Sequence, residues 1–404
     1  MRLGDLGEIC GGSTPSTKNP AFWDGSIPWV VPTDVSRNNG FFISDTERKI
    51  TDAGLKSCAA KLLPPGTVIM TSRATIADVV INKVPMTTNQ GFINIICNDA
   101  LVFNEFLAFW IKFNKKLFEA RAHRVTFREI SKSNFKNIQI NLPPLAEQKA
   151  IAKVLRAVQE AKEARWRELA LERERKAALM EHLFAHGTRG EPRKKTEIGE
   201  IPESWRVAKL GEIGKVITGT TPPTEIADYF NGPYMFITPG DIEQGKYITK
   251  TQRYLSKDGL KVSRQLPPNT VIVVCIGATI GKVAMTSAES AINQQINALI
   301  VKKQFSPQFV YYAIDYRSNY LPLLAGRAAV PIVNKSAFEA FSIPMPSLIS
   351  EQEEIATILS VCDDKIAALE QELSLLEELF NTLLEELMTG RLSALPLVED
   401  ESAS

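Results

Sequence analysis

The chain has 404 residues, of which 44% are hydrophobic and 23% are charged, and its 47 Lys and Arg nearly balance its 46 Asp and Glu. This composition is typical of a globular protein with two or three domains, and it excludes collagen-like, disordered and disulfide-scaffold classes. No window approaches the roughly 18 apolar residues of a membrane span, and residues 1–10 lack the layout of a signal peptide, so we expect a cytoplasmic protein with no membrane contact. The five cysteines form no CxxC pair, which argues against a disulfide framework and against a metal site.

The chain contains an internal repeat whose period is close to half its length. The repeated segments share one order and are separated by similar distances, which indicates a duplicated unit of roughly 200 residues and a pseudo-symmetric molecule. The clearest pairs are residues 6–9 and 210–213 (LGEI), 63–68 (LPPGTV) and 266–271 (LPPNTV), 89–90 and 293–294 (NQ), and 147–148 and 351–352 (EQ).

Each half opens with a lobe whose pattern indicates short strands and turns. β-Rich apolar runs stand between Pro, Gly and Asn residues, and helical stretches are expected near 103–120 and 307–320. The sequence therefore predicts an α+β protein with two pseudo-symmetric mixed α/β lobes. The expected domains are lobe 1 (1–146), a first long helix (147–186), a linker rich in Gly, Lys and Arg (187–200), lobe 2 (201–350), a second long helix (351–390) and a tail (391–404).

The two long helices show the pattern of a coiled-coil seam. In the second helix, apolar side chains alternate at spacings of four and three residues, whereas the first helix is apolar at both ends and charged in its middle. Charged seam positions select a partner, so we expect the two helices to pair with each other. The apolar seam positions are Ile151, Leu155, Val158, Leu169, Leu179, Leu183, Ile355, Leu359, Ile366, Leu369, Leu373, Leu376, Phe380, Leu383 and Leu387.

Charge is distributed unevenly along the chain. Residues 1–146 carry 17 Lys and Arg against 12 Asp and Glu, residues 206–350 carry 15 against 9, and the helix at 351–390 carries 1 against 11. Basic lobes suit a phosphate-bearing partner, although an excess of this size also falls within ordinary surface variation. DNA would repel the acidic helix, which must therefore face another helix or a protein.

No catalytic or metal-binding motif is evident. Residues 277–283 (GATIGKV) resemble a phosphate-binding loop, but the spacing between the glycines is one residue short, and Val283 stands where Ser or Thr would hold magnesium. His182 and His186 are one helical turn apart and lack a third ligand. The sequence favours a binding protein over an enzyme, with no metal and no cofactor of its own.

The repeated order of lobe, proline-rich stop, Glu-Gln and long helix resembles the specificity subunit of Type I restriction-modification systems. Residues 142–148 (LPPLAEQ) and 201–213 (IPESWRVAKLGEI) carry the likeness, which covers essentially the whole chain. It implies that each lobe reads half of a bipartite double-stranded DNA target and that the helices pack antiparallel as a spacer. It also implies two docked modification (methyltransferase) subunits and an added restriction (translocase) subunit, and these partner subunits would bind S-adenosylmethionine and ATP.

Two lobes that read different half-sites should agree where they fold and differ where they contact bases. Divergent polar loops are therefore the expected readers, since Arg can bond guanine and Asn or Gln can bond adenine in the major groove, although a solvated loop or a phosphate contact is the alternative for each residue. In lobe 1 the candidates are Arg37, Asn38, Asn39, Arg73, Arg121, Arg124, Thr126 and Arg128; in lobe 2 they are Gln244, Lys246, Arg317, Asn319 and Arg327.

Two other functions remain open from the sequence. A coiled-coil scaffold whose lobes bind protein would explain the acidic helix and the near-neutral total charge. An enzyme that uses residues 277–282 on a nucleotide is disfavoured by the missing magnesium-binding hydroxyl. Steeply salt-dependent binding to duplex DNA would separate the DNA-reading function from the scaffold.

Overall fold

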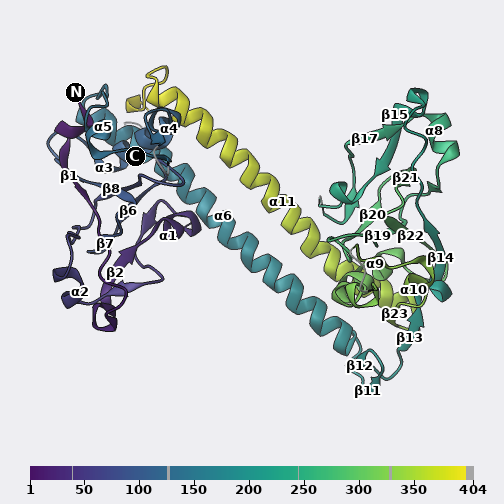
Figure 1. Cartoon of the computed structure of the whole chain (residues 1–404). Coiled ribbons are helices and arrows are strands. Elements are labelled where there is room, and N and C mark those ends of the chain that lie inside the picture. Colours follow the sequence, from purple (N-terminus) through teal and green to yellow (C-terminus); the bar gives the residue numbers. More distant parts are fainter. Residues whose placement is uncertain (39, 125–127, 244, 327–329, 397–404) are drawn as a thin grey trace. The chain divides into compact units, whose positions relative to one another are not determined.

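The chain forms two compact units in the computed structural model, which describes residues 1–38, 40–124, 128–243, 245–326 and 330–396. Unit 1 comprises Met1–Arg167 with the segment that begins at Gln371, and unit 2 comprises Glu168–Glu370. The long helices α6 (Leu145–His186) and α11 (Ile349–Met388) are each divided between the two units, so that each unit contains part of both helices (Figure 1). Among the described residues, no helix combines the length and apolar character needed to cross a bilayer.

The lobe of unit 1 is built on a five-stranded sheet with the order β1-β8-β5-β6-β3, in which only β3 runs parallel to its neighbour. A three-stranded sheet, β4-β2-β7, and a two-stranded one, β10-β9, complete it. The elements are β1 (Gly7–Gly11), β2 (Trp23–Val30), α1 (Pro32–Arg37), β3 (Phe42–Ile43), β4 (Lys49–Ile50), α2 (Asp52–Lys56), β5 (Val68–Thr71), β6 (Val79–Asn82), β7 (Thr87–Thr88), β8 (Phe92–Cys97), α3 (Asn104–Phe113), α4 (Lys115–Ala120), β9 (His123–Arg124), β10 (Arg128–Glu129) and α5 (Lys132–Lys136).

The lobe of unit 2 repeats this plan. Its five-stranded sheet has the order β14-β22-β19-β20-β16, again with one parallel pair, β16 with β20. A four-stranded sheet, β17-β15-β21-β18, and the pair β13-β23 complete it. The elements are β13 (Arg206–Lys209), α7 (Leu210–Ile213), β14 (Gly214–Thr218), β15 (Phe230–Ile237), β16 (Tyr247–Ile248), β17 (Arg253–Leu255), α8 (Lys257–Val262), β18 (Gln265–Leu266), β19 (Val271–Val274), β20 (Val283–Thr286), β21 (Ser290–Ile292), β22 (Ile296–Val301), α9 (Pro307–Tyr316), α10 (Lys335–Glu339) and β23 (Ser342–Met345).

Side chains shared by the two halves hold the same turns in both lobes. The Thr14 hydroxyl donates a 2.6 Å hydrogen bond to Oε1 of Gln90, and the Thr221 hydroxyl donates an equivalent 2.6 Å bond to Gln294. Each bond ties the segment after β1 or β14 to the turn before β8 or β22. The repeat in the sequence is therefore a repeat of hydrogen bonds as well as of strands.

In unit 1, the first part of α6 packs against the last part of α11 and against the lobe. Leu155 of α6 and Phe380, Leu384 and Leu387 of α11 share one buried core with the five-stranded sheet and α3. Lys162 pairs with Glu377, and Arg165 pairs with Glu372 at 2.8 Å, so the helices run antiparallel here.

In unit 2 the opposite ends of the two helices pack together. The end of α6, with Leu183 and Phe184, joins the start of α11, with Ile355 and Leu359, in the core of the second lobe. Lys176 and Asp363 form an ion pair of 2.6 Å, again in antiparallel register. Every apolar seam position named above is buried or half-buried, and so are the charged positions Lys162 and Glu172. The α+β class with two long paired helices is confirmed.

Residues 187–200, which composition predicts as a linker, carry regular structure. Strands β11 (Arg193–Thr196) and β12 (Gly199–Pro202) form an antiparallel hairpin. Ile201 and Trp205, at the end of and just after this hairpin, are 3% and 0% exposed and belong to the core of unit 2. Burial of these two side chains anchors a segment whose polar composition alone would leave it unstructured.

Gln352 offers a test of how the helix joins the lobe in unit 2. Its side chain is 1% exposed, accepts a 2.9 Å bond from the Ser306 amide and donates a 3.0 Å bond to the Pro346 carbonyl. Gln352→Ala should lower the free energy of unfolding of unit 2 by about 2–4 kcal/mol, because the buried Ser306 amide loses its partner. Hydrogen exchange under denaturant measures the loss. The exposed neighbour Glu353→Ala is the control, and equal losses in both variants would contradict this role.

Candidate nucleic-acid interface

A turn and a loop meet at one edge of the lobe in unit 1. The turn at 72–78 joins β5 to β6, and the loop at 121–131 joins α4 to α5. The two are tied by a bridge between Arg73 and Glu129 and by a 3.1 Å bond from the Ile130 amide to the Ser72 carbonyl. We call this edge the first loop cluster, residues 72–78 with 121–131, of which 125–127 lie outside the described residues.

The first loop cluster presents three of the expected arginines. Arg121 and Arg128 are exposed, and Arg128 donates a 2.6 Å bond to the Glu119 carbonyl while its guanidinium stays at the surface. Arg73 is half-buried and pairs with Glu129 at 2.9 Å. Two cationic side chains that face solvent from a loop held on a sheet are suited to meet phosphates or base edges.

Ala74 and Ala77 in the same turn adopt left-handed backbone conformations, with φ of 58° and 67°. A residue with a Cβ is disfavoured in this region by roughly 1–2 kcal/mol. Such strain is concentrated at functional sites, where the surrounding structure imposes it. The surrounding structure therefore holds this turn in a strained backbone conformation.

The other described candidates of unit 1 are Arg37 and Asn38, of which Asn38 lies beside this cluster. Asn38 uses its side-chain amide on the Gly40 and Phe42 carbonyls, at 2.8 and 3.1 Å, and lines a hollow of about 240 Å³ with Asp78 and Lys115. Arg37 is exposed and pairs with Glu47 at 2.7 Å. The structure thus groups Arg73, Arg121 and Arg128 and leaves Arg37 in a separate ion pair.

Unit 2 has the corresponding edge. The turn at 275–282 meets the segment at 317–334 through a bridge between Ile276 and Ile332 and a 2.8 Å bond from the Val333 amide to the Cys275 carbonyl. We call it the second loop cluster, residues 275–282 with 317–334, of which 327–329 lie outside the described residues.

Of the candidates on this edge, Arg317 is turned into the lobe and Asn319 is exposed. The Arg317 guanidinium donates a 2.5 Å bond to the Ser342 carbonyl and lies 5.0 Å from the centre of the Tyr320 ring. Burial lowers the pKa of Arg317 below its ordinary value. Arg317 is therefore placed to support the backbone and Tyr320 rather than to reach outward.

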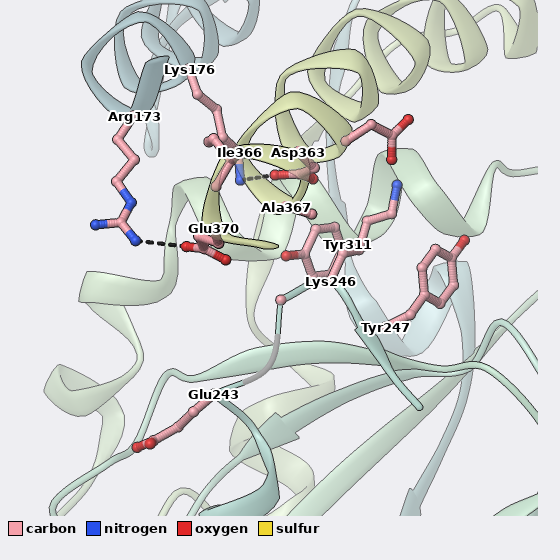
Figure 2. Close-up of a pocket in the computed structure, with 12 residues that line it drawn as sticks. Arg173, Lys176, Glu243, Lys246, Tyr247, Tyr311, Asp363, Ile366, Ala367 and Glu370 are labelled. Carbon is pink, nitrogen blue, oxygen red and sulfur yellow. Dashed lines mark hydrogen bonds and ion pairs between the residues drawn. The ribbon is translucent and has the colours of Figure 1, made fainter. Parts of the chain in front are cut away.

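Lys246 lies in a pocket of about 470 Å³ between the lobe and the helices of unit 2 (Figure 2). Its ammonium donates bonds to the hydroxyls of Ser360, at 2.9 Å, and Tyr312, at 3.3 Å. The Tyr312 hydroxyl in turn donates a 2.5 Å bond to Asp363, which also pairs with Lys176. Burial lowers the pKa of Lys246, and the nearby charge of Asp363 opposes this effect.

Several expected readers fall where the structure gives no description. Asn39, Thr126, Gln244 and Arg327 lie outside the described residues, as does the side chain of Arg124. Within the described residues, no group of three His, Cys, Asp or Glu side chains could hold a metal ion.

Sequence reasoning missed the apolar character of the second loop cluster. Leu323, at 76% exposure, and Leu324, at 43%, face solvent there. The available signal was a pair of leucines (residues 323–324) in a loop bounded by Pro322 and Gly326, without a helical or strand period.

Comparison with known proteins places this architecture in a family. The family model for the Type I restriction modification DNA specificity domain matches residues 1–170 and 202–378, one copy for each half. The chain belongs to the Type I restriction modification DNA specificity family. The resemblance seen in the sequence is therefore confirmed.

Individual members of the family show how far the similarity extends. The Type I restriction enzyme MjaIX specificity subunit of Methanocaldococcus jannaschii is 34% identical over 256 residues, which are 61% of this chain and 58% of that protein. The HindI specificity subunit of Haemophilus influenzae is 34% identical over 152 residues, 36% of this chain and 33% of that protein. The chain thus spans 58% and 33% of the lengths of these relatives.

Among solved structures, the S subunit of a Type I restriction-modification system from M. genitalium has a TM-score of 0.66 at 15% identity, over 96% of this chain and 95% of that chain. A structure that describes complex assembly and conformational transition of the Type I system has a TM-score of 0.54 at 19% identity, over 96% of each chain. At these identities the similarity supports the fold.

Proposed function

We propose that this chain is the DNA-recognition subunit of a Type I restriction-modification complex. Each lobe reads one half of a bipartite duplex target in the major groove, and the chain itself performs no catalysis. The observation that carries the proposal is the pair of loop clusters, which occupy the same place in two lobes of one fold and bear different side chains. A duplicated scaffold with divergent loops suits two readers with different half-sites.

Charge supports the same function. Both lobes carry more Lys and Arg than Asp and Glu, whereas the second helix carries 11 acidic residues against one basic residue over 351–390. Basic lobes attract a phosphate backbone, and the same phosphates would repel the acidic helix. In the proposed assembly the paired helices set the number of unread base pairs and offer a docking surface to two methyltransferase subunits.

The partner subunits would supply all the chemistry. The methyltransferase subunits would bind S-adenosylmethionine, and a restriction subunit would bind ATP, so this chain needs neither cofactor. Its residues contribute recognition and spacing.

Co-expression with the neighbouring modification subunit tests the proposal. DNA from the expressing cells is sequenced by a method that reports methylated adenines. Methylation confined to one split motif with a fixed spacer is the expected result, and it also reveals the target. An active complex that methylates no defined motif would refute sequence reading by these lobes and favour a scaffold that binds protein.

Substitution of Arg121 distinguishes whether this side chain contacts a base or a phosphate. We expect Arg121→Ala to relax specificity at one position of the motif by about 10- to 100-fold, with little rescue by Arg121→Lys, because lysine lacks the bidentate geometry that reads guanine. Lys56→Ala, which removes an exposed lysine at the end of α2, is the control for a lobe cation outside the loop cluster. Uniform weakening on all sequences, a flatter salt dependence and rescue by lysine would instead identify a phosphate contact.

A further inference from the structure

The second loop cluster exposes a group of large apolar side chains. Leu323 is 76% exposed, Tyr320 and Val330 are each 53% exposed, Ile332 is 47% exposed and Leu324 is 43% exposed. Isolated apolar residues on a surface are ordinary, but several gathered on one loop cluster mark a binding surface. We call these five residues the apolar patch.

The apolar patch occupies the place that arginines occupy in the other lobe. Where unit 1 joins its turn and loop through Arg73 and Glu129, an ion pair, unit 2 joins the equivalent segments through Ile276 and Ile332. The flanking backbone bonds, from the Ile130 amide in unit 1 and from Val333 in unit 2, are also equivalent. The two edges therefore match in backbone and differ in chemistry.

The backbone beneath the patch is held by the lobe. Leu321, between Tyr320 and Leu323, is fully buried, and the Arg317 guanidinium lies over the Tyr320 ring while bonded to the Ser342 carbonyl. The turn at 275–282 packs closely on this segment, because a Cβ on Gly281 would stand 2.9 Å from the Ser318 carbonyl. The apolar side chains thus project from an anchored segment.

Duplex DNA offers one apolar group in the major groove, the C5-methyl of thymine, while the other readable groups are hydrogen-bond donors and acceptors. Resting on the proposed function, we infer that the second lobe reads its half-site through contact between the apolar patch and thymine methyl groups. This edge occupies the same place in its lobe as the arginine-bearing edge does in the other lobe, and this equivalence favours DNA as the occupant. The first lobe, with Arg121 and Arg128, reads polar base edges instead.

Replacing thymine with deoxyuridine tests the inference, since the substitution removes only the methyl group. The methyltransferase complex is assayed on duplexes that carry its established target, with deoxyuridine placed in one half-site at a time. Each substitution in the half-site of the second lobe should weaken binding about fourfold, the effect of removing one methyl group from an apolar contact. Substitution in the other half-site should change binding by less than about twofold.

A double-mutant cycle assigns the effect to the patch. In Leu323→Ala, the sensitivity to deoxyuridine should largely disappear at one position, because the contact is already lost. Val262→Ala is the matched control, since Val262 is 50% exposed on α8 of the same lobe and lies outside both loop clusters and both long helices. The control complex should retain full sensitivity.

Three results would overturn the inference and leave the proposed function intact. They are a half-site without thymine on either strand, specific binding that is insensitive to deoxyuridine in both half-sites, and a Leu323→Ala chain that loses its methyltransferase subunit while DNA binding by the remaining complex is unchanged. The last result would identify the patch as a protein interface. Absence of any sequence-specific binding would instead refute the proposed function itself.

Discussion

Phe380→Lys should destabilise unit 1 by more than about 4 kcal/mol. Phe380 is fully buried, and its ring lies 6.0 Å from that of Phe109, which stacks on Phe41 at 4.3 Å. Loss of a buried phenylalanine ring alone costs about 3–5 kcal/mol. The lysine adds the cost of bringing an ammonium group into this aromatic cluster.

The charges around Phe380 increase that cost. The ammonium groups of Lys112 and Lys162 already lie 4.6 and 4.8 Å from the centre of its ring. Burial and the charge of Lys162 lower the pKa of Lys112, so the site already disfavours positive charge. Burial by itself would raise the pKa of Glu377, yet the hydrogen bond and charge of Lys162 hold this pKa below its ordinary value. The Glu377 carboxylate is therefore already paired with Lys162. A third ammonium would therefore lack a counter-charge.

Hydrogen exchange resolved by unit is the appropriate measurement, because two compact units need not unfold together. Phe380→Leu is the control and should cost about 1–2 kcal/mol, since it keeps the site apolar. Protection in unit 2 should change little in either variant. Equal losses for leucine and lysine would show that volume alone, and not charge, governs the site.

The two units use opposite chemistry at equivalent places. Where unit 1 has Phe41, Phe109 and Phe380 in contact, unit 2 has a hydrogen-bonded network. By their positions in the repeat, the unit 2 counterparts are Lys246 for Phe41, Tyr312 for Phe109, Lys176 for Phe380, Asp315 for Lys112 and Arg173 for Glu377. Each end of a long helix is therefore complementary to the lobe on which it packs. If the ends were exchanged, Lys176 would meet the ammonium of Lys112 in unit 1, and Phe380 would leave polar groups of unit 2 unpaired.

Periodicity predicted the helix seam well, because each apolar position follows from spacing along one helix. The charged middle of α6 was also visible, although the identity of its partners, such as Glu377 for Lys162, depends on the antiparallel register. The α+β lobes followed from the alternation of short apolar runs and turns. These features are local or repeat regularly, so a single sequence contains them.

Loop residues were harder to place because tertiary contacts decide where they point. Lys246 and Arg317 have the side chains of base readers, yet both are bonded inside unit 2. The offset that relates Glu147 to Glu351 would make Gly277 the counterpart of Arg73. The equivalent bridges, Arg73 with Glu129 and Ile276 with Ile332, make Ile276 its counterpart instead. One extra residue in the second turn accounts for the shift, since the Thr71 amide bonds to Asp78 while the Val274 amide bonds to Lys282.

On the proposed function, lengthening both helices by one heptad should abolish methylation at the original spacing and favour a longer spacer. We place one insertion of seven residues between 165 and 166 and another between 371 and 372, on either side of the Arg165–Glu372 ion pair. These insertions preserve the seam, because a heptad rotates the helix face by only about 20°. The added length is about 10 Å, or roughly 3 base pairs. Losing one half-site should cost more than about 100-fold at the original motif, since each mismatched pair costs about 1–3 kcal/mol.

Helical phase sharpens this experiment. Three base pairs turn the duplex by nearly a third of a turn, so one heptad should restore methylation only partly at the longer spacer. Three heptads add about 31 Å, or roughly 9 base pairs, which is close to a full turn of 10–10.5 base pairs, and recovery should be greater. Insertion into α6 alone is the control, because it misaligns the seam and should destabilise the helix pair. An unchanged spacer in the doubly lengthened chains would mean that the helices do not set the distance, and sequencing of methylated adenines decides between the outcomes.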